Sequence, residues 1–294
     1  MPFPAPRLDH VVVDARDRMD EAARVYRALG FQLTARSRHT LGSVNHLAVF
    51  GSDYLELLGF EPEAGPVRPD ILPFPVGMNG LVFSTDQPDS LWDELRARNV
   101  PVQDPQSFSR PVRLAEGGTQ ETHEAKFRVV RLRPGTASFG RVYFCHHLTP
   151  DLVWRPEWQQ HPNGALGVAG IHIAARDPAA AAEVLSRMFG PDSLHAGSDG
   201  SWTLAAGPVQ VTLLTSEQLA WRFGDAKRPS IGGVVSPDPA GRADYMAALA
   251  IRTASLSQAA RALEAGGIRR ARIEPQRILI PAAEAMNVTL EFVE

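Results

Sequence analysis

The sequence predicts an α+β fold built from four copies of one β-α-β-β-β unit. A strand, a turn and a helix recur four times along the chain, and each helix precedes several short strand-like runs. The length of 294 residues is enough for about two domains. Antiparallel strands that follow each other in sequence and carry a helix on one face are typical of α+β proteins.

The first copy begins with LDHVVV at residues 8–13, where His10 stands among β-branched residues. Asp17 follows as a turn or N-cap residue, and a helix with apolar residues at helical spacing runs to Gly30. The runs FQLTAR, VNHLAVF and DYLELL then predict three further strands.

The third copy repeats this pattern, with His172 of GIHIAA in the place of His10. Asp177 and Pro178 begin an alanine-rich helix, and Gly190 ends it. SWTLAA and VQVTLL are the strands that follow.

The second and fourth copies, at residues 80–100 and 249–268, are weaker. RVYFCHH is expected as the last strand of the second copy. RRARI, RILIP and NVTLEFVE are expected as the strands of the fourth. Pairing the copies divides the chain into an N-terminal domain, 1–160, and a C-terminal domain, 161–294.

Composition narrows the class of protein. A net charge of −3 and a pI near 6.3 argue against a nucleic-acid partner. No apolar run approaches the roughly 20 residues that span a membrane, and no signal peptide is recognisable. The single cysteine, Cys145, fits a reducing cytoplasm. We therefore expect a cytoplasmic protein that binds a small-molecule substrate, neither nucleic acid nor membrane, with a homodimer as an assembly to test.

Four such units, with a histidine on a first strand and YLEL on a last strand, resemble the vicinal oxygen chelate superfamily (the glyoxalase, bleomycin-resistance and extradiol dioxygenase fold). RHTLGSVNHLAVFGSDYLELLGFEP and HHLTPDLVWRPEWQQHPNGA narrow the resemblance to glyoxalase-like domain proteins over residues 8–175. The resemblance implies two cupped mixed sheets, each made by two units. It also implies metal ligands on the first and last strand of a unit.

The resemblance gives the N-terminal half a set of candidate ligands for a divalent metal ion such as Zn, Fe, Mn or Ni. His10 lies on the first strand, and Glu56, also a candidate catalytic residue, lies on the cup-facing side of DYLELL. Val82 replaces the histidine of the second unit, so His147 or His146 would complete the set. Only one of these neighbours can face the cup, and the motif favours His147.

The C-terminal half offers His172 and Glu291 as a weaker second metal site. Thr212 stands where Glu56 stands in the first unit, and Ala250 takes the fourth histidine position. We expect a degenerate site here, in which His172 is a hydrogen-bonded core histidine or Glu291 a surface carboxylate.

Polar residues in RSRHTLGSVNHL (36–47) are candidates for substrate binding: Arg38, His39 and Asn45. The alternative is a solvated hairpin that turns at Gly42.

The linker 149–165 contains Trp154 and Trp158 and is too aromatic for an exposed tether. We expect both side chains to be largely buried, either in a brace between the halves or in a lid, in which Trp154 would contact substrate. The proline-rich crossovers 61–79 and 224–244 are expected to be mobile and able to gate a cup.

Two functions follow from the resemblance. The first is a metal-dependent enzyme of the lyase, isomerase or dioxygenase type, whose small-molecule substrate is chelated through neighbouring oxygens. The alternative is a metal-free protein of the bleomycin-resistance type that binds or sequesters a small molecule. The metal-free alternative is favoured by three residues at nominal ligand positions. Two of them, Val82 and Ala250, have no ligand atom, and Thr212 has only a weak one.

Overall fold

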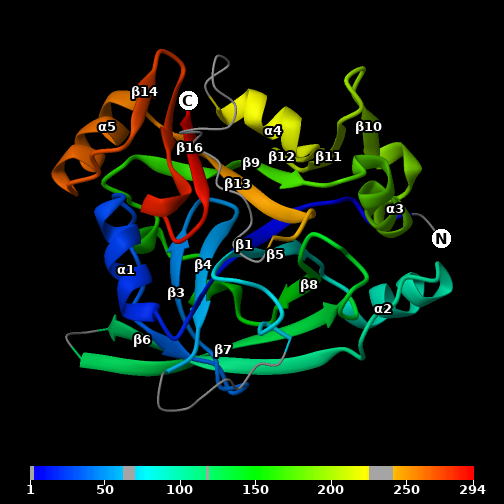
Figure 1. Cartoon of the computed structure of the whole chain (residues 1–294). Helices are drawn as coiled ribbons and strands as arrows, with labels where there is room; N and C mark the ends of the chain where they lie inside the picture. Colours follow the sequence, from blue (N-terminus) through cyan, green and yellow to red (C-terminus); the bar gives the residue numbers. More distant parts are fainter. Residues whose placement is uncertain (1–2, 62–69, 117–118, 225–240) are drawn as a thin grey trace.

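The protein consists of two eight-stranded mixed sheets (Figure 1). The helices of the repeated units pack on one face of each sheet, and α4 (Ser216–Phe223) packs on the cup face of the second sheet. This computed structural model describes residues 3–61, 70–116, 119–224 and 241–294. The sheet orders are β2-β3-β4-β1-β5-β8-β7-β6 and β10-β11-β12-β9-β13-β16-β15-β14. The second order repeats the first, so the predicted α+β fold of paired β-α-β-β-β units is confirmed.

Each half contains two units. The first unit is β1 (Leu8–Arg16), α1 (Met19–Ala28), β2 (Ser37–Arg38), β3 (Val44–Val49) and β4 (Tyr54–Gly59). The second is β5 (Gly77–Ser84), α2 (Pro88–Ala97), β6 (Gln106–Glu116), β7 (Thr119–Arg131) and β8 (Arg141–His147).

The third unit is β9 (Ala165–Ala174), α3 (Pro178–Phe189), β10 (Leu194–Ala196), β11 (Trp202–Ala206) and β12 (Val209–Leu214). The fourth is β13 (Tyr245–Thr253), α5 (Leu256–Ala265), β14 (Arg272–Glu274), β15 (Arg277–Ile280) and β16 (Thr289–Val293). An additional helix, α4 (Ser216–Phe223), was not expected from the sequence.

The predicted strand FQLTAR is wrong. Residues 31–36 are irregular, and only Ser37 and Arg38 form a strand. The reason lies at Thr34, whose backbone N–H donates to the carbonyl of Leu47 at 2.9 Å while its hydroxyl accepts from the backbone N–H of Leu47 at 2.9 Å. A side chain thus replaces one half of a regular ladder pair.

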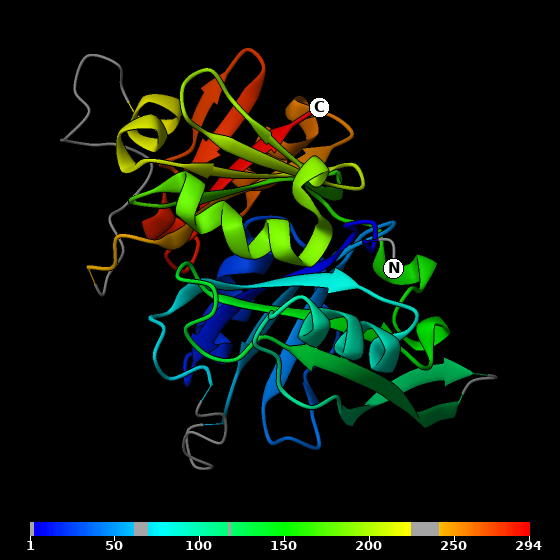
Figure 2. The ribbon, with the colours of Figure 1, turned by 90° about the vertical axis from the view of Figure 1, so that its right-hand side faces the viewer.

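The helix-covered faces of the two sheets pack against each other, so the halves share one apolar core. Phe83 of β5 and Phe189 of α3 lie with ring centroids 4.7 Å apart, and Phe31 and Phe292 lie 6.0 Å apart. Figure 2 shows the two sheets as separate layers with α3 between them. The opposite face of each sheet forms its own cup with its own apolar cluster.

Polar contacts at the end of the linker also join the halves. The Nε2 of His161 donates to the carbonyl of Val49 at 2.9 Å, and the Nδ2 of Asn163 donates to the carbonyl of Leu29 at 2.9 Å. The hydroxyl of Thr253 donates to the carbonyl of Asn163 at 2.8 Å. These groups, and not the tryptophans, connect the two sheets.

Trp154 and Trp158 are mostly, though not completely, buried, which agrees with the expectation that this linker is packed. Both pack against the apolar cluster of the N-terminal cup. The brace interpretation therefore does not describe their contacts. Residues 62–69 and 225–240, the central parts of the two crossovers, lie outside the described residues, so the expectation that the crossovers gate a cup stays a prediction. Within the described part of the chain, no helix has the length and apolarity that a membrane span requires.

Candidate functional site

The strand order places the first and last strands of each unit at the centre of a cup, and the register shows which residues lie opposite each other. In the N-terminal sheet, Val12 of β1 lies opposite Glu56 of the parallel strand β4. Across the antiparallel pair β1–β5, Val12 lies opposite Gly80 and His10 opposite Val82. Two central positions on the floor of the cup are therefore valines, Val12 and Val82. His10 lies on β1 two residues before Val12, so both side chains point to the same face.

The equivalent positions of the C-terminal sheet differ. His172 lies opposite Ala248, and Gly170 lies opposite Ala250. ALAIRT, which starts at Ala248, aligns with GLVFST of the second unit, so His172 corresponds to Val12. The expectation that His172 repeats the place of His10 is wrong by one pleat. Eight residues lie between His10 and α1, whereas five lie between His172 and α3.

His10 is fixed on both sides of its ring. The register of β1 shifts between Leu8 and His10, which leaves Asp9 in a bulge. The Nδ1 of His10 donates to the Asp9 carboxylate at 2.5 Å. The ring stacks on Tyr54 at 4.3 Å between centroids. The Nε2 of His10 is thereby aimed at the Glu56 Oε2, 3.7 Å away, and accepts from the Tyr143 hydroxyl at 3.3 Å.

Glu56 is a buried carboxylate, 6% exposed, that faces the cup as alternation along β4 predicts. The Nδ2 of Asn45 donates to its Oε1 at 2.7 Å, and the Nε2 of His39 lies 3.8 Å from the same oxygen. Burial alone would raise the pKa of Glu56, but His10, His39 and Asn45 together lower it below its usual value. The carboxylate is therefore held in its charged form.

A small cavity of about 30 Å³ separates these groups, which is room for one or two water-sized groups. Its polar side is lined by His10, His39, Asn45, Glu56, Arg110 and Tyr143. Apolar side chains such as Leu47, Leu58, Phe108 and Phe127 form the rest of the wall. Burial raises the pKa of Tyr143, so its hydroxyl stays protonated.

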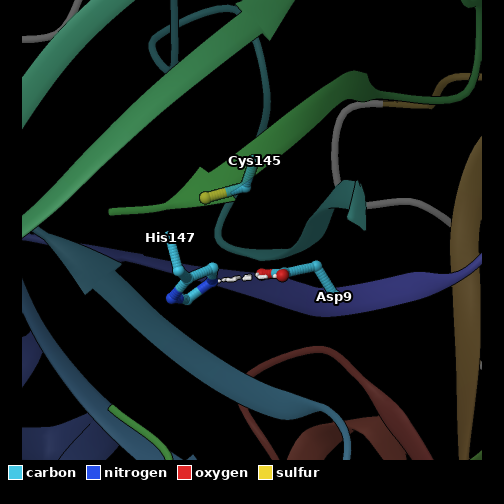
Figure 3. A group of neighbouring side chains, drawn as sticks. All are labelled: Asp9, Cys145 and His147. Carbon is cyan, nitrogen blue, oxygen red and sulfur yellow. Dashed lines mark hydrogen bonds and ion pairs between the residues drawn. The ribbon is translucent and has the colours of Figure 1, made fainter. Parts of the chain in front are cut away.

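Of the two neighbouring histidines at the end of β8, His147 faces the cup. The Nδ1 of His146 is directed to the backbone carbonyl of Thr85 at 3.0 Å. The Nε2 of His147 donates to the Asp9 carboxylate at 3.1 Å (Figure 3). Its Nδ1 is buried and, among the described residues, has no hydrogen-bond partner.

The three ligands expected from the sequence do not gather at one point. In the described part of the chain, the group of histidine, cysteine and acidic side chains whose ligand atoms lie within 4.8 Å of one another is Asp9, Cys145 and His147. Figure 3 shows this group at the ends of β1 and β8. Burial alone would raise the pKa of Asp9, but His147 and His10 hold it far below its usual range. Burial also raises the pKa of the Cys145 thiol.

The predicted substrate-binding residues separate into two groups. His39 and Asn45 line the cavity, whereas Arg38 is half exposed, 3.9 Å from Glu61 and away from the cavity wall. Trp154 is not among the side chains that line the cavity, but its ring centroid lies 5.5 Å from those of Tyr54 and His147.

Sequence reasoning missed the cup-facing residues Asp9, Arg110, Tyr143 and Cys145. Asp9 had one available signal, since it directly precedes a histidine on an apolar strand. Arg110 had another, since it shares a strand face with Phe108 and Val112 by alternation.

The C-terminal cup brings the two candidate residues together, with the Nε2 of His172 3.9 Å from the Oε2 of Glu291. Glu291, however, has other partners. Glu291 accepts from the Nη2 of Arg222 at 3.0 Å and from the Nη1 of Arg277 at 3.1 Å. Both ring nitrogens of His172 are buried without a hydrogen-bond partner among the described residues. Burial, with a smaller contribution from Arg222, lowers the pKa of His172 to about 3. The ring packs edge-on against Phe223 of α4 at 5.2 Å.

Residues 8–189 match a protein-family model described as a glyoxalase-like domain. Among solved structures, a hypothetical protein from Staphylococcus aureus matches with a TM-score of 0.64 and 12% identity over 98% of this chain and 99% of that chain. A mutant of 4-hydroxymandelate synthase from Streptomyces coelicolor matches with a TM-score of 0.56 and 12% identity, over 100% of this chain and 93% of that chain.

A fusion protein of a xylose isomerase-like TIM barrel and 4-hydroxyphenylpyruvate dioxygenase also matches, with a TM-score of 0.57 and 13% identity. That match covers 100% of this chain and 50% of the other. Identities this low establish a shared fold alone. None of the curated proteins matches this sequence.

Proposed function

The chain belongs to the glyoxalase-like domain family, and from this premise we propose that it is a metal-dependent enzyme that acts on a small molecule in its N-terminal cup. The proposed catalytic domain is 1–160, and the C-terminal domain, 161–294, serves as scaffold. The fold family implies a divalent metal ion that a substrate chelates through neighbouring oxygens.

One observation carries the proposal: the Nε2 of His10 lies 3.7 Å from the Oε2 of Glu56. Two ligands that bind one ion at about 2.0–2.2 Å are separated by roughly 3–4 Å. Asp9 binds the other ring nitrogen of His10 at 2.5 Å, which is how carboxylates orient metal-binding histidines. His10 and Glu56 would therefore hold the ion, and His147 would support them through Asp9 in place of the ligand role expected from the sequence.

The group Asp9, Cys145 and His147 is a second place for an ion. An ion there would need the thiolate of Cys145, whereas burial raises the pKa of this thiol. Coordination by Asp9 would also compete with its hydrogen bond to the Nδ1 of His10. We therefore assign the ion to His10 and Glu56.

A bound divalent ion would supply a Lewis acid that stabilises a developing oxyanion. The residues around it supply proton transfer. Glu56 is held in its charged form and can accept a proton, while the protonated hydroxyl of Tyr143 can donate a hydrogen bond. One histidine and one carboxylate fall short of the two-histidine, one-carboxylate set of oxygen-activating iron sites. Lyase or isomerase chemistry therefore fits better than dioxygenase chemistry.

A metal-free binding protein is the second candidate. It is favoured by the valine side chains at two central floor positions, Val12 and Val82, which have no ligand atoms. In this case, Glu56 and His10 would act as hydrogen-bonding groups for a ligand.

Metal analysis of protein purified without chelator tests the proposal. We expect about one divalent ion per chain, a lower melting temperature after chelator treatment, and recovery on adding metal back. His10→Gln should lose the ion, while the matched variant His172→Gln should keep it. If wild-type protein contains no metal and its melting temperature does not change on adding Zn²⁺, Mn²⁺, Ni²⁺ or Fe²⁺, the metal-free binding function is supported instead.

A further inference from the structure

Arg110 is a charged residue at a cup-facing position of an otherwise apolar strand face. On β6, Phe108, Arg110 and Val112 share one face, and Val112 belongs to the apolar cluster of the cup. The Arg110 side chain is 3% exposed and lines the cavity together with Glu56. Its guanidinium lies 5.9 Å from the ring of Phe127.

The guanidinium is only weakly compensated, because Glu56 and Tyr54 act on it electrostatically from beyond salt-bridge distance. Its Nη2 is buried and has no hydrogen-bond partner in the described part of the chain. Salt bridges within 4.0 Å bring other buried charges together, including Glu56 with His10 and Glu291 with two arginines, but the described residues provide none for Arg110. A buried charge without a salt bridge is unfavourable for folding, and a bound anion would supply the missing partner.

Resting on the proposed function, we propose that Arg110 anchors the carboxylate of a small carboxylic-acid substrate. A guanidinium presents a planar fork that matches a carboxylate with two parallel hydrogen bonds. The rings of Phe108 and Phe127, stacked with centroids 5.2 Å apart, form a flat wall beside it. Repulsion from Glu56 would keep the substrate carboxylate on the Arg110 side, so that the rest of the molecule extends towards His10.

The size of the cavity favours a carboxylate over a phosphate. A cavity of about 30 Å³ is small, and a carboxylate needs less room than a phosphate. The negative charge of Glu56 on the same wall would also oppose a second negative charge on the ligand. One carboxylate, by contrast, balances one guanidinium.

Binding of acetate, compared with its neutral isostere acetamide and with inorganic phosphate, tests the inference by calorimetry and by thermal shift. Wild-type protein should bind acetate and not acetamide. Arg110→Met should weaken acetate binding more than about tenfold, and Arg110→Lys should weaken it less. Arg113→Met is the matched control, since Arg113 lies exposed on the opposite face of the same strand.

Several outcomes would overturn the assignment. These are equal acetate binding by wild type and Arg110→Met, equal binding of acetate and acetamide, no acetate binding by wild type, and binding of phosphate in preference to acetate. A purely structural role for Arg110 predicts a lower melting temperature for Arg110→Met without ligand, whereas removal of an unpaired buried charge predicts an equal or higher one. Acetate binding by wild-type protein that holds no metal would reject the proposed function and leave the anchor standing.

Discussion

The two cups of this protein have the same strand order and register, yet their buried carboxylates have opposite surroundings. Glu56 and Glu291 both lie opposite the central residue of a first strand, Val12 in one sheet and Ala250 in the other. Glu56 is contacted by an amide and two imidazoles, whereas Glu291 has one imidazole, that of His172 at 3.9 Å, and hydrogen bonds from Arg222 and Arg277. The repeated fold thus places the two carboxylates at similar positions, and the surrounding side chains determine the charge and availability of each.

The difference between the neighbours has a chemical consequence. Two guanidinium groups neutralise Glu291 and occupy both of its oxygens, so a cation gains nothing there. Asn45 occupies only one oxygen of Glu56, and the other oxygen faces His10. The N-terminal carboxylate is therefore available for a cation or a proton, and the C-terminal one stabilises the fold.

Replacing each carboxylate with glutamine should produce opposite effects. Glu56→Gln should reduce metal affinity by more than about 100-fold, because the variant loses a charged ligand, and should leave the fold intact. Glu291→Gln should leave the metal content unchanged and lower the free energy of unfolding by about 1–3 kcal/mol, because two arginines lose their counter-charge. Metal analysis and denaturant unfolding of both variants measure this. Equal metal content in wild type and Glu56→Gln would remove the distinction between the cups.

The linker allows a second comparison, between the part over the N-terminal cup and the part between the halves. Asn163→Ala should lower the free energy of unfolding by about 2–3 kcal/mol, since it leaves the buried carbonyl of Leu29 and the N–H of Ala165 without their partners. Trp154→Ala should change stability less and should alter ligand binding in the N-terminal cup, because Trp154 contacts Tyr54 and His147. Thermal unfolding and acetate titration of both variants separate the roles. A greater loss of stability in Trp154→Ala would restore the brace interpretation.

Periodicity and turn residues were enough to predict the four units, because strands and helices that bury one face carry that period in their sequence. The outward and inward faces of β4 also followed from alternation: Glu56 faces the cup, and Leu55 and Leu57 join the shared core. Register between strands did not follow, because it depends on bulges such as the one between Asp14 and Arg16, which lies between His10 and α1. His10 and His172 were therefore equated wrongly.

The side chains that contact the site residues could not be predicted from the sequence either. Arg110 and Tyr143 reach the cavity from strands far along the chain from Glu56, and only the sheet order β1-β5-β8-β7-β6 brings them there. The two arginines around Glu291 come from α4 and β15, and α4 was not predicted at all.

Titration offers a third comparison, because His172 is buried without hydrogen bonds and its pKa is lowered to about 3. In the unfolded chain this histidine is protonated below its ordinary pKa of about 6.5. In the folded chain it stays neutral until the pH falls to about 3. The free energy of unfolding should therefore fall as the pH falls, by about 2 kcal/mol from this residue between about pH 7.5 and about pH 5. Urea unfolding across this range should show a smaller loss for His172→Leu than for wild type. His195→Gln, at an exposed histidine of the same half, serves as the control. Parallel pH profiles of wild type and His172→Leu would contradict the burial argument.

The smallest expected effect separates the two places for an ion within the N-terminal cup. Cys145 belongs to the group with Asp9 and His147 and lines the same cavity as His10 and Glu56, but the proposed function does not use its thiol as a ligand. Cys145→Ala removes one buried sulfur and should cost about 1 kcal/mol of stability, while metal content and affinity stay at the wild-type level. Metal analysis and isothermal titration with Zn²⁺ check this against Glu56→Gln. Loss of the ion in Cys145→Ala together with its retention in Glu56→Gln would move the metal centre to Asp9, Cys145 and His147. His10 and Glu56 would then be a hydrogen-bonded pair beside that centre.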